Sequence, residues 1–526
     1  MRGREELNRY HPEVAIRFLE KAVELDSTFA MAHFHLAQTY NWLGNTRARN
    51  DAYKKAKTFS KKVTDKERLY IEAGYAITIE QNIEKRFRIF NQLAKKYPNE
   101  KQIHFELGLD YWRDELFYEA IEEFNKALEL DPNYAGAMIQ LPYIYAEIGD
   151  YEKAIEYLKR YATVFPGDAN PFDCMGSVYF NMGKLDEAIA KFKEALEVEP
   201  GFGSNWEIAY IYALKEDYPE AMKWVDQYIT MQSSPAQRAE GFLWKGLYYY
   251  WLGSLDRSLS ELDRAANLWK AVGNEEWVAF AGWMKGWVYY EKGKFELARN
   301  CFRRYYDFLI EKLPASMLYH RITNSFYLGL VDLKEGRRDS IKAKLAEMKS
   351  LLIGISQDRE IYDNLRILQT YDDELAIYEI NTTFRYNLLY AEVSLAEDAV
   401  EKAIAICEKE SLLGKYRAIE WIRSMIHYNA PFLNDVLARA YHQNRELDKS
   451  ITEYERLITF DPNSKDRRLI HPKYHYRLAK LYEEKDWLSK AIKEYEKFLY
   501  FWKDADKNLP ELVDAKARLA RLVQQK

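Results

Sequence analysis

The chain has 526 residues, more than one ordinary hydrophobic core holds, so its length predicts several domains or one elongated array. Its 77 basic and 82 acidic residues give a net charge of -5, which leaves no positive field to attract nucleic acid or anionic lipid. The three cysteines form no C-x-x-C pair, and no apolar run approaches the ~18 residues of a membrane span, so we expect a soluble cytoplasmic protein without a disulfide framework or a zinc site.

A repeat runs through residues 67–200, in a chain whose few glycines and prolines predict helix throughout. Three kinds of residue recur there at intervals of 34 residues, which chance does not maintain over several copies. The recurring positions are Pro98, Pro132, Pro166 and Pro200, Tyr111, Tyr145 and Tyr179, and Ala120, Ala154 and Ala188.

This unit resembles the tetratricopeptide repeat (TPR), a pair of antiparallel helices of 34 residues. The signature is an aromatic residue, Leu-Gly and Tyr on the first helix, with Ala, Phe and a closing Pro on the second. The clearest copy contains His104, Leu107, Gly108, Tyr111, Ala120, Phe124, Ala127 and Pro132.

The spacing of the signature has a physical cause. Gly108 lacks a side chain where the second helix crosses the first, and Ala120 lets that second helix approach its neighbours. Phe124 fills the space between the paired helices, and Pro132 ends the second helix because it cannot continue it. The resemblance therefore implies an all-α TPR superhelical solenoid of about 12 antiparallel helix pairs with a C-terminal capping helix.

Four segments follow in chain order. Residues 1–235 form a regular TPR array, and residues 236–356 carry TPR-like units whose helices are longer by about one turn. Residues 357–430 are an irregular helical segment with a long helix at 357–380, and residues 431–526 hold C-terminal TPR units and the capping helix. Because Gly3 aligns with the middle of a first helix, we expect that an upstream part is missing from this chain.

Aromatic residues flank the packing signature on the first helix of many units. In the TPR family such positions face the concave surface, where aromatic side chains favour a protein partner. The alternative is that these residues pack between neighbouring first helices. The predicted partner-binding residues are Phe105, Trp112, Tyr143, Phe180, Trp206, Tyr210, Trp251, Trp283, Trp287 and Tyr290.

A second candidate surface is basic. Lys473, Arg477 and Lys480 share one helix face, and with Arg439 they could bind an acidic group. The alternative interpretation is a solvated basic face. The lysine and asparagine clamp with which some TPR proteins hold a carboxylate is absent from the three clearest units.

Motifs for catalysis, cofactors and metals are missing. His471 and His475 have the spacing of two ligands on a helix, but no H-E-x-x-H motif and no third ligand accompany them. We therefore expect no catalytic residue, no cofactor and no metal.

The favoured hypothesis is a non-catalytic protein–protein interaction scaffold that binds a partner segment in an aromatic-lined concave groove. One alternative makes the chain the sensory or docking arm of a larger bacterial signalling protein that carries a kinase, cyclase or transcription regulator. Another makes it a peptide-binding regulator. The expected partner is a protein or peptide, with no nucleic acid and no membrane insertion.

Overall fold

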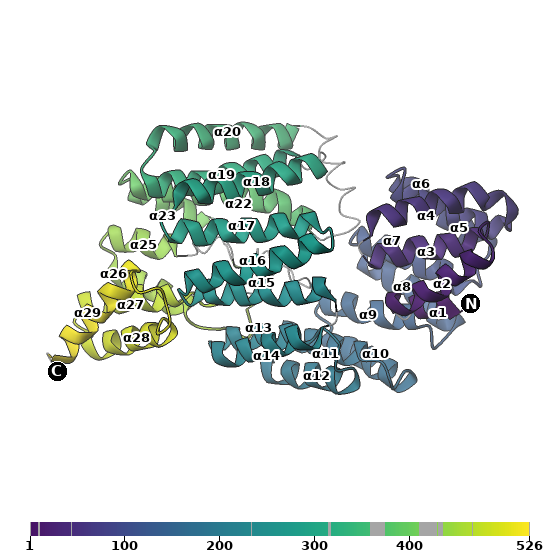
Figure 1. Cartoon of the computed structure of the whole chain (residues 1–526), viewed down its shortest axis with the longest axis horizontal. Helices are drawn as coiled ribbons and strands as arrows, with labels where there is room; N and C mark the ends of the chain where they lie inside the picture. The colour runs from purple at the N-terminus through teal and green to yellow at the C-terminus, as the bar shows by residue number, and fades with distance from the viewer. Residues whose placement is uncertain are drawn as a thin grey trace. The chain divides into compact units, whose positions relative to one another are not determined.

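The computed structural model describes residues 2–8, 11–43, 45–232, 234–313, 317–357, 374–409, 429, 435–464 and 467–524. These residues form 27 α-helices and one short 3-10 helix, with no strand among them, which confirms the all-α fold class (Figure 1). The helices group into two compact units, Met1–Val178 and Tyr179–Lys526. None of the described helices has the length and apolar character that a bilayer span requires.

The first unit is a stack of helix pairs. A hydrophobic cluster that runs from Leu7 to Leu107 joins the helices from α1 to α7. The elements are α1 (Arg2–Asn8), α2 (Pro12–Leu25), α3 (Ala30–Trp42), α4 (Thr46–Phe59), η1 (Ser60–Lys62), α5 (Asp65–Thr78), α6 (Ile83–Lys96), α7 (Lys101–Arg113), α8 (Phe117–Leu130), α9 (Ala135–Glu147) and α10 (Tyr151–Val164), with α11 (Asn170–Asn181) crossing the boundary.

The second unit continues the same alternation of paired helices. Its described helices up to residue 409 are α12 (Leu185–Val198), α13 (Asn205–Leu214), α14 (Tyr218–Met231), α15 (Pro235–Trp251), α16 (Leu255–Ala271), α17 (Glu275–Glu291), α18 (Phe295–Lys312), α19 (Met317–Glu335), α20 (Arg338–Gln357), α22 (Glu374–Ala396) and α23 (Val400–Lys409). Those after residue 434 are α25 (Val436–Gln443), α26 (Leu447–Leu457), α27 (Pro472–Glu484), α28 (Leu488–Phe501) and α29 (Pro510–Gln524).

Consecutive helices pack in pairs, as expected of the solenoid. Within the described residues, the paired helices in contact include α1/α2, α3/α4, α5/α6, α7/α8, α9/α10, α13/α14, α15/α16, α17/α18, α19/α20, α22/α23, α25/α26 and α27/α28. This arrangement is that of the expected solenoid of helix pairs, and α29 lies at the predicted place of the capping helix. Its buried residues Leu512, Ala515 and Leu522 form the face that packs on the last pair.

Small residues lie where paired helices cross, which confirms the predicted alignment of the repeats. A Cβ atom on Gly108 would lie 2.7 Å from the ring of Phe124 in α8. The same relationship holds for Gly286 and the ring of Phe302, also at 2.7 Å. A side chain at either glycine would therefore force the two helices apart.

Helices α15 to α20 of the second unit are longer than the helices of the first unit. Helices α15, α16 and α17 each have 17 residues, whereas α8 and α10 have 14. The expected lengthening by about a turn is therefore present. Much of the long helix predicted at 357–380 lies outside the described residues, and the four-segment division of the chain stays a prediction.

Candidate functional site

In the first unit, α7 and α9 bring together two of the predicted aromatic residues. Trp112 and Tyr143 stack with their ring centroids 6.3 Å apart and their planes 15° from parallel. Both residues are half-buried, so solvent reaches part of each. The hydroxyl of Tyr143 lies 3.0 Å from the Sγ atom of Cys174 in α11, which fixes the orientation of the ring. The stack is therefore a partly accessible aromatic surface that spans two repeats.

Phe105, the third predicted residue of this group, has a packing role instead. Its side chain is 9% exposed. Its ring lies 5.6 Å from that of Phe124 and 5.4 Å from that of Tyr134, which join the second helix of its own unit to the next unit. A partner could reach little of Phe105 in this conformation.

Most of the predicted aromatic residues in the second unit are also buried. Trp283 is 0% exposed and Trp287 is 2% exposed, and the ring of Tyr327 in α19 packs edge-on against both, at 5.6 Å. These two indoles therefore join α17 to the next pair, as the packing interpretation expects. Phe180, Tyr210 and Trp251 are buried as well.

Two predicted residues of the second unit stay half-exposed. Trp206 stacks on Trp244 at 5.9 Å, with the ring planes 12° apart, and Tyr290 packs edge-on against Trp287 at 5.7 Å. The binding role of all ten residues stays a prediction. Four of these ten residues are partly accessible to solvent, namely Trp112, Tyr143, Trp206 and Tyr290.

The predicted basic surface is neutralised by carboxylates of the chain itself. Lys473 pairs with Glu291 at 2.7 Å and with Glu511 at 2.9 Å. Burial favours the neutral acid at Glu291, yet the ammonium of Lys473 outweighs it and lowers the pKa of Glu291 below its ordinary value. The positive charge of Lys473 is therefore already balanced by two carboxylates of the chain, those of Glu291 and Glu511.

The two arginines of this surface also pair with carboxylates of the chain, whereas Lys480 contacts an aromatic ring. Arg439 pairs with Glu392 and Asp435, and Arg477 pairs with Asp435 as well. Lys480 lies over the ring of Tyr476 at 5.6 Å. An acidic partner would have to displace these internal carboxylates, so the surface is less suited to an acidic group than its sequence indicates.

The two histidines singled out by their spacing serve structural roles. Burial, with a smaller contribution from the charge of Lys473, lowers the pKa of His471 to about 3, and its neutral Nδ1 accepts a hydrogen bond from the backbone N–H of Lys473. His475 Nδ1 lies 2.6 Å from Glu494 and its Nε2 lies 2.8 Å from Glu216. Both ring nitrogens of His475 are thus engaged. Within the described residues, no group of three or more His, Cys, Asp or Glu side chains is placed to hold a metal ion.

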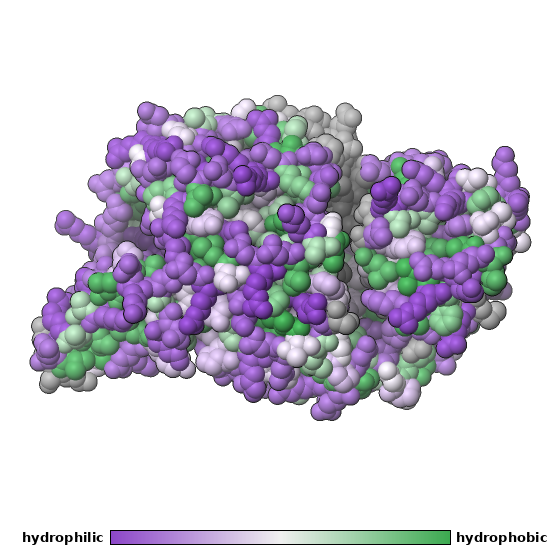
Figure 2. Space-filling view, in the orientation of Figure 1, coloured by the Kyte–Doolittle hydropathy of each residue, from purple (hydrophilic) through white to green (hydrophobic). Residues whose placement is uncertain are grey.

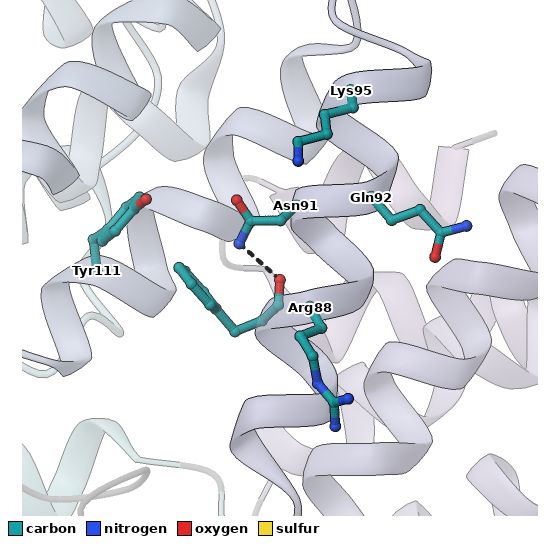
Figure 3. Close-up of a pocket in the computed structure, with 6 residues that line it drawn as sticks. Arg88, Asn91, Gln92, Lys95 and Tyr111 are labelled. Carbon is teal, nitrogen blue, oxygen red and sulfur yellow. Dashed lines mark hydrogen bonds between the residues drawn. The ribbon is translucent and has the colours of Figure 1, made fainter.

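A shallow pocket lies between α6 and α7, and none of its lining residues is among the predicted binding residues. Its lining consists of Phe87, Arg88, Asn91, Gln92, Lys95 and Tyr111 (Figure 3). Tyr111 meets Phe87 edge-on at 5.4 Å, and the Asn91 amide donates to the backbone carbonyl of Phe87 at 2.9 Å. This mixture of basic, amide and aromatic groups is unlike the enclosed apolar pocket that a small molecule needs.

The exposed surface shows apolar and polar side chains interspersed. On the face shown in Figure 2, apolar residues form small patches that polar residues separate. Exposed large side chains include Trp42 at 52% and Tyr118 at 76%, and scattered residues of this kind are usual on soluble proteins.

Family models of the tetratricopeptide repeat match several parts of the chain. One matches residues 88–135 and 175–238, a second matches residues 114–171, and a third matches residues 434–464 and 472–501. The matched segments include α7, α9, α13 and α27, and therefore the Trp112–Tyr143 stack. No curated protein shows significant similarity to the chain.

Similar solved structures cover about a third of the chain. A crystal structure of MamA is 26% identical over 30% of this chain and 93% of that one, with a TM-score of 0.27. MamA from Desulfovibrio magneticus RS-1 is 20% identical over 32% and 96%, with a TM-score of 0.28. A thermophilic TPR protein of Thermus thermophilus is 19% identical over 38% and 98%, with a TM-score of 0.29. At these scores, the likeness supports no statement about a partner.

Proposed function

The chain is a tetratricopeptide-repeat protein, and we propose that it holds a segment of a partner protein on the Trp112–Tyr143 stack of its first unit. Arrays of this family are generally interaction scaffolds rather than enzymes, and their repeats build extended binding surfaces. The proposal concerns which surface of this chain is used.

The single observation that carries the proposal is the half-exposed stack itself. Trp112 and Tyr143 come from the first helices of adjacent units, so together they offer one aromatic platform that spans two repeats. Tryptophan and tyrosine supply large contact area with few rotatable bonds, which is why they dominate binding energy at many interfaces. The buried tryptophans Trp283 and Trp287 would not serve this purpose without a rearrangement of their helices.

The finer alternatives rest on resemblance alone. As the docking arm of a larger bacterial signalling protein, the chain would use the same platform to contact a partner or a linked domain. As a peptide-binding regulator, it would bind a short free segment there. The two differ in what is captured, a folded protein or a small peptide.

The test is affinity capture from the native host, followed by mass spectrometry of the retained proteins. The baits are the wild-type chain, Trp112→Ala, and the matched control Tyr118→Ala, which removes an aromatic ring that is 76% exposed on the second helix of the same repeat. We expect Trp112→Ala to lose a partner that the wild type and Tyr118→Ala both retain. Retention of the same proteins by all three baits would exclude the platform as the binding surface. Equal melting temperatures would show that each bait is folded.

A further inference from the structure

In the second unit, an irregular segment of the chain is buried against three helices. Residues Arg467–His471, here called the latch segment, connect α26 to α27 in neither a helix nor a strand. Even so, Arg467, Leu469 and Ile470 are between 4% and 7% exposed. Irregular segments usually run over the surface because their buried backbone groups would lack hydrogen-bond partners.

Side chains from α13, α14 and α15 supply those hydrogen bonds. The hydroxyl of Tyr210 donates to the carbonyl of Arg467 at 2.7 Å. The indole N–H of Trp251 donates to the carbonyl of Ile470 at 2.9 Å, and the hydroxyl of Tyr218 lies 3.4 Å from the same oxygen. Three aromatic residues thus hold a backbone that is in neither a helix nor a strand, as a receptor holds a peptide.

The backbone N–H of Leu469, within the latch segment, has a hydrogen-bond partner as well. The N–H of Leu469 donates to the side-chain oxygen of Asn429 at 2.7 Å, and the amide of Asn429 donates to the hydroxyl of Tyr210 at 2.9 Å. Tyr210 thus contacts the latch segment directly, at the carbonyl of Arg467, and indirectly, through Asn429. All of these atoms are shielded from water, where a missing partner would cost about 1–3 kcal/mol.

The side chain of Arg467 fixes one end of the segment. Its Nε donates to the carbonyl of Phe180 at 3.2 Å and its Nη2 donates to that of Asn181 at 3.0 Å, the last two residues of α11. Its guanidinium also lies 5.8 Å from the ring centroid of Phe180. A cation is favoured at a helix C-terminus, where backbone carbonyls lack helical partners.

Glycine makes room for the residues that precede the latch segment. A Cβ atom on Gly183 would lie 2.1 Å from the carbonyl oxygen of Pro462. Gly183 has a φ of +75°, as Gly293 has a φ of +68° at the corresponding turn between α17 and α18. A Cβ on Gly293 would meet nothing within 4 Å. The close approach at Gly183 is therefore specific to the path of this segment.

We propose that Phe180, Asn181, Tyr210, Tyr218 and Trp251 form a binding face for an extended segment with the pattern Arg-x-Leu-Ile, filled in this conformation by the latch segment. A partner that carries this pattern binds there by displacing residues 467–471. Specificity comes from the arginine, which binds the carbonyls at the C-terminal end of α11, and from the two buried aliphatic side chains of Leu469 and Ile470. This face belongs to the second unit, so the proposal stands independently of the Trp112–Tyr143 platform.

The first experiment measures release of the latch segment in the full chain by limited trypsin digestion, with mass spectrometry of the cut after Arg468. Gly183→Ala introduces the clash with Pro462, whereas Gly293→Ala introduces the same unfavourable φ without a clash. We expect cleavage at this bond at least 10-fold faster in Gly183→Ala than in Gly293→Ala. Arg467→Ala, which leaves the binding face intact, should show the same acceleration. Equal cleavage in the wild type and all variants would overturn the proposal.

The second experiment measures binding in trans. The probe is a fluorescent synthetic peptide of residues 460–472, with a scrambled peptide as control. We expect it to bind the Arg467→Ala chain at least 10-fold more tightly than the wild type, because the internal competitor is weakened. Adding Tyr210→Phe should reverse that gain, since it removes the hydroxyl that the carbonyl of Arg467 accepts from. Equal affinity for the wild type and Arg467→Ala, or no effect of Tyr210→Phe, would contradict a displaceable segment.

Discussion

The indole N–H of Trp251 donates a 2.9 Å hydrogen bond to the backbone carbonyl of Ile470, 219 residues further along the chain. Trp251 ends α15, and Ile470 precedes α27, so this bond joins the middle of the second unit to its C-terminal repeats. Nearby, Ser254 Oγ donates to the carbonyl of Asp504 at 2.6 Å and the N–H of Asp506 donates to the carbonyl of Gly253 at 3.0 Å. The C-terminal repeats are thus held against α15 at two places.

Trp287→Ala should destabilise the protein far more than Trp112→Ala. Trp287 is 2% exposed and contacts Phe302 and Tyr327, so its removal leaves a cavity and costs roughly 3–5 kcal/mol. Trp112 is half-buried, so Trp112→Ala should lower the free energy of unfolding by less than about 2 kcal/mol. The measurement is the urea midpoint followed by circular dichroism. Equal midpoints for the two variants would mean that Trp287 is not a packing residue.

Gly108→Ala should also be destabilising, by about 1–3 kcal/mol, because the new Cβ would lie 2.7 Å from the ring of Phe124. The matched control is Gly282→Ala in α17, where a Cβ meets nothing within 4 Å. That change should stabilise by up to about 1 kcal/mol because alanine favours helix. Thermal melts of both variants test the prediction, and a neutral Gly108→Ala would place the helix crossing elsewhere.

Stability should fall as the pH rises above the ordinary histidine range. Burial disfavours the charged form of His475, but hydrogen bonds to Glu216 and Glu494 outweigh it and raise the pKa of His475 above its ordinary value of 6.5. Lys497, which faces the same Glu216 at 2.5 Å, favours the charged form of Glu216 but opposes protonation of His475. A raised folded-state pKa gives stability that is full below 6.5 and is lost as the pH passes the folded value.

The control for this prediction is His475→Gln, which keeps one donor and cannot titrate. We expect the urea midpoint of the wild type to fall relative to that of His475→Gln as the pH rises from about 6 towards the folded-state pKa. Parallel curves over that window would show that the pairing of His475 contributes nothing to folding. A second variant, Lys497→Gln, measures how much the neighbouring cation contributes to the pH dependence of stability.

Replacing Lys473 by alanine should destabilise the protein much more than replacing Lys480, although both residues lie in α27. Lys473→Ala leaves Glu291 and Glu511 close together without their cation and should cost roughly 3 kcal/mol. Lys480 only covers the ring of Tyr476, so Lys480→Ala should stay within about 1 kcal/mol of the wild type. Urea midpoints of the two variants decide this. Equal effects would favour a simple solvated basic face.

The repeat period sufficed to predict the helix pairs and their crossings. Gly108 and Phe124 are 16 positions apart, and contacts of that kind follow from local geometry that every unit repeats. The binding surface was harder to predict. Trp287 occupies the expected helix face, but Tyr327 of the next pair covers it, and the sequence does not state how closely neighbouring first helices approach.

The burial of the latch segment could not be predicted from the sequence, because the residues it contacts are far from it along the chain. Arg467 and Phe180 are separated by 287 positions, and no period relates them. One signal was present in the chain. Helix α26 ends at Leu457 and α27 begins at Pro472, a connection much longer than that between Leu130 and Ala135. A connection of unusual length inside a regular repeat can mark a segment with a binding role.

The most direct test of the proposed function is the affinity of the captured partner for three chains, measured by calorimetry at a temperature where all are folded. We predict that Trp112→Ala weakens binding by ~30-fold, equivalent to ~2 kcal/mol, with little change in melting temperature. Trp287→Ala should lower the melting temperature and leave the affinity of the folded protein near that of the wild type. Wild-type affinity in Trp112→Ala, together with a loss in folded Trp287→Ala, would contradict the account.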